Sequence, residues 1–253
     1  MDTNQDRTSL FVDGQWAAPA TGATVEVIEA ATEKVLATAA LAAPADIDAA
    51  VAAARRALDS WRSLDHAARA DHLDRFAAAL KARAKQTAVL ASRENGMPIA
   101  TSINVNGYAP ALMVEYYARL IRDAERDEVR PSAFGGRTVV RREPVGVVAA
   151  VTPWNYPQSL AAMKVAPALA AGCTVVLKPA PETALDAYAF AEAAEEAGLP
   201  AGVPVEAARV ISPELTLNRS IAMEITSDRL PRCLPLPLAA SRLHGPREAA
   251  SGR

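Results

Sequence analysis

The chain has 253 residues, of which 51% are hydrophobic and 22% charged, and its formal net charge is −2. This length and composition give a globular protein ample material for a core, and the near-neutral charge provides no electrostatic reason to bind nucleic acid or an anionic membrane. The polar start, the lack of a long apolar run and the presence of only two cysteines lead us to expect a cytoplasmic protein without a membrane segment. The three histidines have no metal-ligand spacing, so no metal site is expected.

Short strands are expected in residues 1–40. The segment LFVDGQW has apolar residues on both sides of Asp13 and Gly14, a pair typical of a hairpin turn. The segment TVEVIEA alternates polar and apolar residues, as a half-buried strand does. Both patterns predict small β-structures at the start of the fold.

Residues 41–127 have the apolar periodicity of helices. The first helix is expected to be capped by Asp46 and to bury the apolar side chains that follow at three- and four-residue spacing. A second helix is expected to open at Asp65 and to bury Leu73 and Phe76.

Two further helices complete this helical part. A third is expected to run to Asn95-Gly96, because glycine after a helix is a common stop. A fourth is expected over Ala109–Ala124, where apolar side chains including Tyr116 and Leu120 recur at helical spacing.

Residues 128–144, from the segment EVRPSAFGGRTVVRREPV, are expected to form an extended β-arm. Glycines favour the conformations that tight turns need. The arm is therefore predicted to turn at Gly135-Gly136.

In residues 145–204 the pattern changes to alternating strands and helices. The apolar run VGVVAAV is typical of a buried parallel strand, a helix follows over Gln158–Ala171 and ends at Gly172, and TVVLK and ETALDAYAFAEAAEEAG predict a second strand and a second helix. A right-handed crossover makes the two strands parallel and brings their carboxyl ends to one edge of the sheet. Asn155 and Lys178 are thus expected to converge where open α/β sheets bind ligands.

The signal weakens beyond Val203. Residues 205–253 are rich in proline, arginine and leucine without a period. We expect this tail to be irregular or disordered.

Several segments together resemble the NAD(P)-dependent aldehyde dehydrogenases. They are EPVGVVAAVTPWNYP, MKVAPALAAGCTVVLKPAPET and EEAGLPAGV, with FVDGQW and RENGMP before them, and the resemblance covers about residues 8 to 204. It implies an α/β fold, with an incomplete Rossmann-type parallel sheet domain, an N-terminal helical region and a β-arm that serves oligomerisation in homodimers or homotetramers. It also implies oxidation of a small-molecule aldehyde to a carboxylic acid with NAD(P)+, through a cysteine thiohemiacetal.

Two residues match catalytic positions of that family. Asn155 matches the side chain that donates to the oxyanion of the attacked aldehyde, although it could instead cap the following helix. Lys164 matches a lysine thought to relay protons near the active site, and the alternatives are a snorkelling side chain or an ion pair with Glu143 or Glu182.

Six residues match the cofactor-binding part of the family. They are Thr152, Pro153, Trp154, Lys178, Ala180 and Pro181. Lys178 matches the lysine that bonds the adenosine ribose hydroxyls, although a strand-end lysine can simply reach solvent, and Trp154 alone would suggest core packing. The cofactor is expected to be NAD. NADP is also possible, because Pro181 stands where NAD-preferring relatives often carry a glutamate that would repel a 2′-phosphate.

Other family motifs do not occur after residue 204. The glycine-serine cofactor turn, the general-base glutamate in an ELGGK-like context and the cysteine in a G-Q-x-C context are not found, and neither Cys173 nor Cys233 has the sequence context of the nucleophile. We therefore expect a chain truncated or frame-shifted before the catalytic domain. The alternatives are a non-catalytic truncated homologue that acts as a binding or oligomerisation module, and a CoA-acylating or phosphate-reducing relative.

Overall fold

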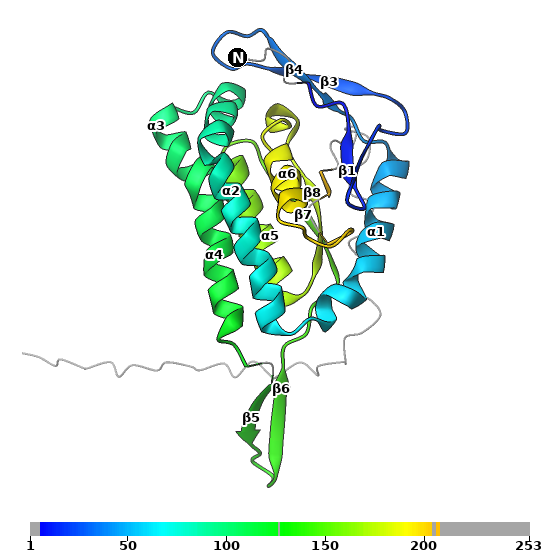
Figure 1. Ribbon diagram of the computed structural model, residues 1–253, viewed down its shortest axis with the longest axis vertical. Coiled ribbons are helices and arrows are strands. Elements are labelled where there is room, and N and C mark those ends of the chain that lie inside the picture. Colours follow the sequence, from blue (N-terminus) through cyan, green and yellow to red (C-terminus); the bar gives the residue numbers. More distant parts are fainter. Residues whose placement is uncertain (1–5, 126, 204–205, 208–253) are drawn as a thin grey trace, which may run out of the picture. The chain divides into compact units, whose positions relative to one another are not determined.

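Figure 1 shows the computed structural model of the chain, which describes residues 6–125, 127–203 and 206–207. All of these residues lie in one unit, Met1–Thr216, whereas the second unit, Leu217–Arg253, lies outside them. The tail expected to be irregular, residues 205–253, falls outside the described residues except at Glu206–Ala207.

The N-terminal part consists of two small antiparallel ladders. They pair β1 (Leu10–Val12) with β2 (Gln15–Ala17), and β3 (Thr24–Ile28) with β4 (Val35–Ala40). The turn between β1 and β2 has Asp13 at a φ of 54° and Gly14 at 73°. Two successive positive φ values are typical of the turns that join hairpin strands, so the predicted turn is confirmed.

Helix α1 (Pro44–Ser63) begins two residues earlier than the expected cap. Asp46 lies inside the first turn, where its carboxylate accepts the N–H of Ala43 at 2.7 Å and that of Ala20 at 3.0 Å. The prediction that Asp46 is the N-cap is therefore wrong by three residues, because Pro44 supplies the favoured first helical residue.

Helix α2 (His66–Asn95) is a single helix of 30 residues where the sequence suggested two. Its start is as expected, since the Asp65 carboxylate accepts the N–H of Ala68 at 2.7 Å. Its end is also as expected, since Gly96 adopts a left-handed conformation with a φ of 74°. Nothing between these two ends breaks the helix, because the intervening residues are mostly good helix formers. Its buried side chains include Leu73, Phe76 and Leu80.

A short irregular helical stretch precedes the expected fourth helix. It comprises α3 (Ile99–Ser102) and the π-helical turn η1 (Ile103–Tyr108), and it leads into α4 (Ala109–Arg122). A Cβ on Gly107 would lie 2.7 Å from the carbonyl oxygen of Ala84 in α2, so only glycine allows this close approach. Figure 1 shows α2, α4 and α5 (Pro157–Ala171) running side by side, and the contacts between α2 and α4 agree.

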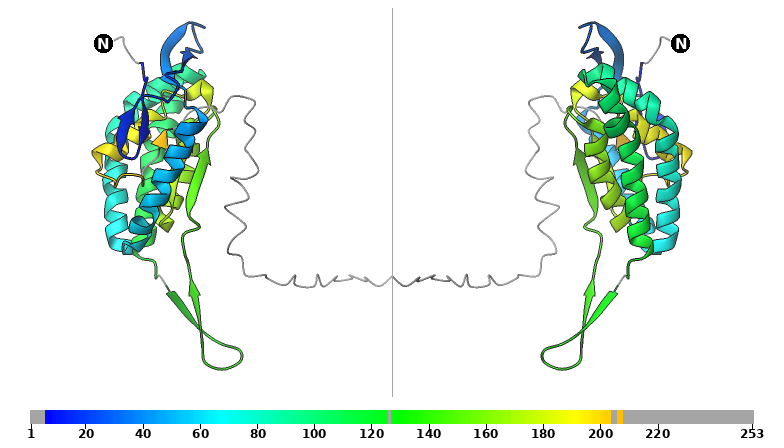
Figure 2. Two further views of the ribbon diagram at one scale, coloured as in Figure 1. Left: turned by 90° about the vertical axis from the view of Figure 1, so that its right-hand side faces the viewer. Right: turned by 90° about the vertical axis from the view of Figure 1, so that its left-hand side faces the viewer.

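The arm is a hairpin of β5 (Asp127–Pro131) and β6 (Arg137–Arg141), paired antiparallel. Gly135 and Gly136 both have a φ of 84° at its turn, as predicted. In Figure 2 the hairpin projects from the helices, and Phe134 at its tip is fully exposed. Its role in oligomerisation stays a prediction.

The central sheet has the order β7–β8–β9, and both strand pairs are parallel. Its strands are β7 (Val147–Val151), β8 (Thr174–Lys178) and β9 (Glu206–Ala207). Helix α5 (Pro157–Ala171) connects β7 to β8 and ends at Gly172, which has a φ of 93°. The predicted parallel pair and its crossover helix are confirmed, and β9 adds a strand inside the segment expected to be irregular.

The sheet lies between helices on its two faces. Val176 of β8 packs with Ala50 and Ala54 of α1. Val175 and Leu177 pack into the larger core formed with α2, α4, α5 and α6 (Tyr188–Glu196). Successive side chains of a strand point to opposite faces of the sheet. In β8 both faces are covered, because all but the last residue of the strand are buried.

Strand β7 is less covered than expected. Only Ala150 of its five residues is buried, and Val151 is 41% exposed. The expectation that both faces of this strand are covered is wrong for the described residues, because β7 has a paired neighbour on one side only among them.

The second crossover begins as a turn and not as a helix. The 3₁₀ turn η2 (Pro181–Thr183) precedes α6 (Tyr188–Glu196), so the regular helix is shorter than predicted. Gly198 lies just beyond it with a φ of 62°, as expected for a helix stop.

Candidate functional site

The two loops that carry the candidate site residues start at the same edge of the sheet. In the parallel register Val151 pairs with Lys178, the last residues of β7 and β8. The Thr152 N–H then donates to the Lys178 carbonyl oxygen at 3.0 Å. The expected convergence of the two strand ends is therefore confirmed, and the loop of residues 152–156 leaves β7 beside the end of β8.

The loop after β7 presents its polar groups to solvent. Thr152 is buried, whereas Pro153, Trp154 and Asn155 are exposed, and Trp154 is 52% exposed. Core packing, the alternative role for Trp154, is therefore wrong in the described part of the chain. Trp154 and Asn155 are therefore accessible to solvent at this edge of the sheet.

Asn155 does not cap the helix that follows it. The N-cap of α5 is Tyr156, and no side chain makes a capping hydrogen bond there. Among the described residues the Asn155 carboxamide has no hydrogen-bond partner within the protein. The capping alternative is thus wrong, and the amide is available as a donor to a bound molecule.

The loop after β8 supplies the other candidate residues. Lys178 is half-buried at the end of the strand, Ala180 is buried, and Pro181 is exposed. Neither residues 152–156 nor residues 178–181 contain a carboxylate. The donor groups at this edge therefore fit an electron-rich ligand, such as the hydroxyls and phosphates of a dinucleotide.

Lys164 belongs to helix α5 and not to either of these two loops. It is exposed on α5, and within residues 6–125, 127–203 and 206–207 it has no ion pair, either with Glu143 or with Glu182. The proposed ion-pair alternatives are not present there, and the proton-relay role stays a prediction.

Asn95, at the end of α2, holds the loop after β7 and was not identified from the sequence. Its Nδ2 donates to the carbonyl oxygens of Trp154 at 3.2 Å and Asn155 at 3.5 Å, and its Oδ1 accepts the N–H of Met97 at 2.9 Å. The only signal in the sequence was the segment RENGMP, which suggested no more than a helix stop.

A pair of buried carboxyls lies beside the loop after β8. Glu94 accepts the N–H groups of Leu185 at 2.7 Å and Asp186 at 3.0 Å, and both acidic side chains are almost fully buried. Burial and then the charge of Asp186 raise the pKa of Glu94 well above its ordinary value, although the two backbone N–H groups act in the opposite direction. Burial raises the pKa of Asp186 to about 8.

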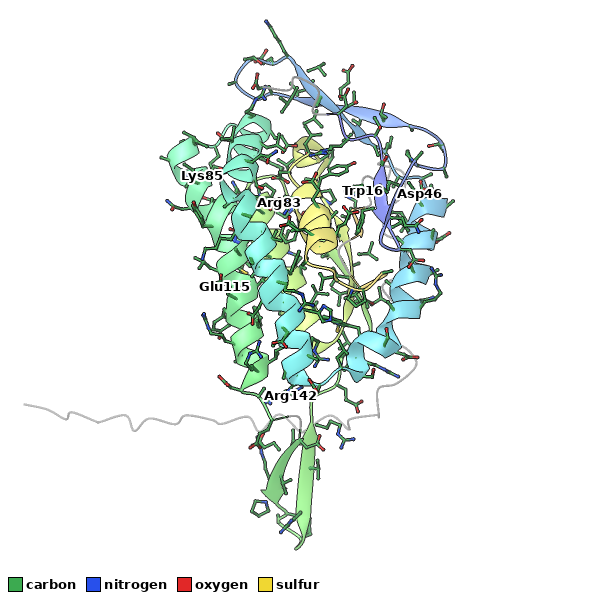
Figure 3. The ribbon with its side chains drawn as sticks, in the orientation of Figure 1. Trp16, Asp46, Arg83, Lys85, Glu115 and Arg142 are labelled. Carbon is green, nitrogen blue, oxygen red and sulfur yellow. The ribbon has the colours of Figure 1, made fainter. Side chains whose placement is uncertain are left out.

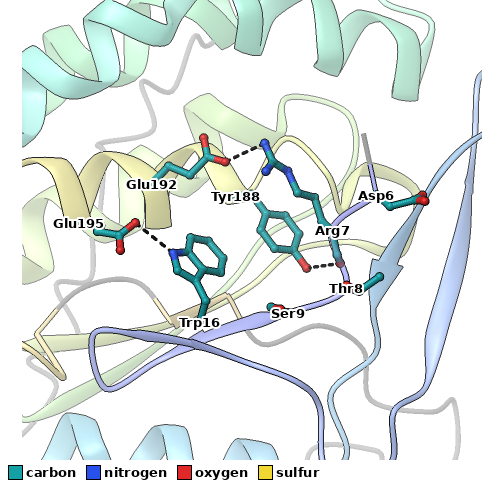
Figure 4. Close-up of a pocket in the computed structure, with 8 residues that line it drawn as sticks. All are labelled: Asp6, Arg7, Thr8, Ser9, Trp16, Tyr188, Glu192 and Glu195. Atoms are coloured by element: carbon teal, nitrogen blue, oxygen red, sulfur yellow. Dashed lines mark hydrogen bonds and ion pairs between the residues drawn. The ribbon is translucent and has the colours of Figure 1, made fainter. Parts of the chain in front are cut away.

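A cavity of about 380 Å³ lies elsewhere, between the N-terminal segment and α6. Figure 4 shows its lining, in which Arg7 pairs with Glu192 at 2.7 Å and the Trp16 indole N–H donates to Glu195 at 3.0 Å. Tyr188 stacks on Trp16 with ring centroids 5.8 Å apart. These mutual contacts attach the N-terminal segment to α6, so the cavity is not the site at the sheet edge.

No group of three or more histidine, cysteine, aspartate or glutamate side chains in the described residues could hold a metal ion. No helix there is long and apolar enough to cross a membrane.

Comparison with known proteins identifies a family for most of the chain. The model of the aldehyde dehydrogenase family matches residues 16–223, so the resemblance extends beyond the expected limit near residue 204. Geranial dehydrogenase of Castellaniella defragrans is 46% identical over 200 residues, which are 78% of this chain and 42% of that protein.

Solved structures give the same result. Aldehyde dehydrogenase C of Pseudomonas syringae, in complex with NAD+ and octanal, aligns with a TM-score of 0.74 at 36% identity, over 80% of this chain and 40% of that one. An NADP-dependent enzyme of E. coli aligns with a TM-score of 0.74 at 35% identity, over 83% of this chain and 43% of that one. The chain thus spans less than half the length of the proteins it matches.

Proposed function

Because the chain belongs to the aldehyde dehydrogenase family, we propose that it serves the NAD(P)-dependent oxidation of an aldehyde to a carboxylic acid. The observation that supports this most directly is the parallel register of Val151 with Lys178, continued by the Thr152-to-Lys178 hydrogen bond. This register brings the start of one candidate loop to the end of the other strand, at the edge where open α/β sheets take ligands.

Asn155 is the proposed oxyanion donor. Its carboxamide is exposed and makes no hydrogen bond within the described residues, so it can donate an N–H to an aldehyde oxygen that gains negative charge. Donors fixed in advance at such a position typically contribute about a hundredfold or more in rate. The loop backbone to which it belongs is held by Asn95, which limits how far the amide can move.

Lys178 is the proposed cofactor anchor. An ammonium group at a strand end can donate to ribose hydroxyls, and Thr152, Pro153, Trp154, Ala180 and Pro181 would line the same surface. When bound, the nicotinamide supplies the hydride acceptor for the oxidation. The lack of a carboxylate in residues 178–181 leaves room for a 2′-phosphate, so both NAD and NADP fit the proposal.

The reaction also requires a thiolate and a general base. Cys173 is 3% exposed and directly precedes β8, which makes it unsuited to attack a substrate. Cys233 lies outside the described residues. We therefore propose that the described residues provide the cofactor and oxyanion side of the site, with Lys164 as a proton relay. The finer proposals are a homodimer or homotetramer, a cytoplasmic location and a tail that is unrelated to the family beyond the matched residues 16–223.

Isothermal titration of the 253-residue chain with NAD and with NADP tests the proposal. Lys178→Ala should weaken binding by about tenfold or more, as expected for the loss of a charge-assisted hydrogen bond. Lys85→Ala is the matched control, since it removes the same charge from an exposed position on α2 (Figure 3). Equal affinities in the wild type and Lys178→Ala would remove the anchor, and failure of the wild type to bind either nucleotide would favour a non-catalytic module.

A further inference from the structure

Two adjacent residues at the end of α2 each hold one of the two loops that carry the candidate site. Asn95 bonds the backbone of the loop after β7, at Trp154 and Asn155. Glu94 bonds the backbone that follows η2, at Leu185 and Asp186.

The Asn95 side chain is itself fixed by the way α2 ends. The left-handed conformation of Gly96 reverses the backbone, so that the Met97 N–H reaches the Asn95 Oδ1 at 2.9 Å. Ser92 Oγ donates to the Met97 carbonyl oxygen at 2.5 Å and holds the same turn from the preceding helical turn. The amide nitrogen of Asn95 is thereby aimed at the two carbonyl oxygens of the loop.

Glu94 is buried, and it accepts hydrogen bonds from the backbone, whereas Asn95 donates them. Only 4% of its surface is exposed, and each of its two oxygens accepts one backbone N–H. The turn that it holds connects η2 to α6, and η2 begins at Pro181, the last residue of the proposed cofactor segment 178–181. Backbone N–H groups that would otherwise be buried without a partner are satisfied in this way.

The base for both contacts is a long helix packed in the core. The 30 residues of α2 include Leu73 and Phe76, which are fully buried. Loops bonded to the end of such a helix share one frame. This support adds to the direct bonds between the two connections, from the Thr152 N–H to the Lys178 carbonyl oxygen and from the Gln158 side chain to the Asp186 carbonyl oxygen. Active sites need this kind of support because misplacement by about 1 Å can cost about a hundredfold in rate.

We propose that Glu94 and Asn95 are positioning residues that fix the loops after β7 and β8 relative to each other. Their importance for catalysis rests on the proposed function, whereas their effect on the loops does not. Asn95 sets the backbone from which the Asn155 carboxamide extends. Glu94 sets the turn behind the segment that begins at Lys178.

Chymotrypsin cleavage after Trp154 tests the role of Asn95. The protease can cleave the Trp154–Asn155 bond only in molecules in which the loop has opened. Cleavage after Tyr156 does not interfere, because Pro157 follows it. Asn95→Asp keeps the acceptor for the Met97 N–H and removes the donor to the loop. We expect the fragment that ends at Trp154 to form about fivefold to tenfold faster, as for one lost hydrogen bond.

Asn104→Ala is the control for this experiment. Asn104 also donates its amide to a backbone carbonyl, that of Ala100, but within its own helical stretch. The rate of cleavage after Trp154 in Asn104→Ala should equal that in the wild type. An unchanged rate in Asn95→Asp, or an equal increase in Asn104→Ala, would overturn the role of Asn95.

Hydrogen exchange at the amides of Leu185 and Asp186 tests Glu94. Glu94→Gln replaces one acceptor oxygen with a donor group, so these amides should exchange about fivefold to tenfold faster. Asn95→Asp should leave them unchanged. Equal exchange in the wild type and Glu94→Gln would overturn the role of Glu94.

A spectroscopic signal and NAD binding separate positioning from simple stabilisation. In chain labelled with 5-fluorotryptophan, the Trp154 resonance, assigned with Trp154→Phe, should broaden in Asn95→Asp, while the midpoint of thermal unfolding changes little. In the same variant the NAD dissociation constant should rise about fivefold or more. A sharp resonance at its original position would contradict the proposal.

If the wild type does not bind NAD, the proposed function fails, and the cleavage and exchange results still decide the positioning role.

Discussion

Replacing Asp186 with asparagine should remove a large part of the pH dependence of stability. The Asp186 carboxyl has an ordinary pKa of 3.8, and burial raises it to about 8 in the folded chain. Between these two values the folded state holds a proton that the unfolded state releases. Stability from this group is therefore fully present below pH 3.8, falls as the pH rises, and is lost once the pH exceeds about 8.

The size of this effect follows from the proton difference. One proton held only by the folded state changes the free energy of unfolding by roughly 1.4 kcal/mol per pH unit. From pH 5.5 to 7.5 the wild type should lose about 3 kcal/mol, which corresponds to roughly 6–12 °C in the unfolding midpoint. Glu94 adds to the loss in the same direction, because its pKa is also raised.

Urea unfolding followed by tryptophan fluorescence measures the effect. Trp61 is buried in the core, so its emission reports the loss of the fold. The free energy of unfolding of Asp186→Asn should depend less steeply on pH than that of the wild type, by close to one proton. Parallel pH profiles for the two proteins would refute the interpretation that Asp186 is protonated in the folded chain.

Three further predictions concern packing and the sheet edge. Phe76→Ala should lower the free energy of unfolding by about 3–5 kcal/mol in urea titrations, because the ring is fully buried against Phe190. Gly202→Ala should destabilise by about 1–3 kcal/mol in the same assay, since its Cβ would lie 2.6 Å from the Ala53 carbonyl oxygen at a φ of 74°; an unchanged midpoint would contradict this contact. The chain should elute as associated species in size-exclusion chromatography, because β7 has an open edge among the described residues, and a clean monomer would contradict that prediction.

The parallel strand pair could be predicted because its signals are local. A short apolar run, a helix that ends at Gly172 and a second β-branched run lie close together in the chain. The handedness of the crossover then determines which strand ends meet. The family motifs added roles for Asn155 and Lys178, but their geometry followed from the strand order alone.

Contacts between distant segments could not be predicted in this way. Glu94 and Leu185 are 91 positions apart, and Asn95 and Trp154 are 59 apart. Their pairing depends on how the long helix packs, for which the sequence has no local pattern. The coverage of β7 was also misjudged, since apolar composition does not say which neighbours a strand has.

The predicted helix boundaries were wrong where two sequence signals competed or where no break was marked. Asp46 has the chemistry of a cap, but Pro44 starts the helix earlier and the carboxylate instead reaches back to Ala43. The two helices expected between Asp65 and Gly96 are one, because the sequence marks both ends and no break between them.

Hydrogen exchange of the full chain with and without NAD tests the proposed site most directly. We predict slower exchange in the peptides that contain residues 152–156 and 178–183, with little change around Trp16 and Tyr188. Protection confined to that second region, or no protection anywhere in the presence of bound NAD, would contradict a nucleotide site at the ends of β7 and β8.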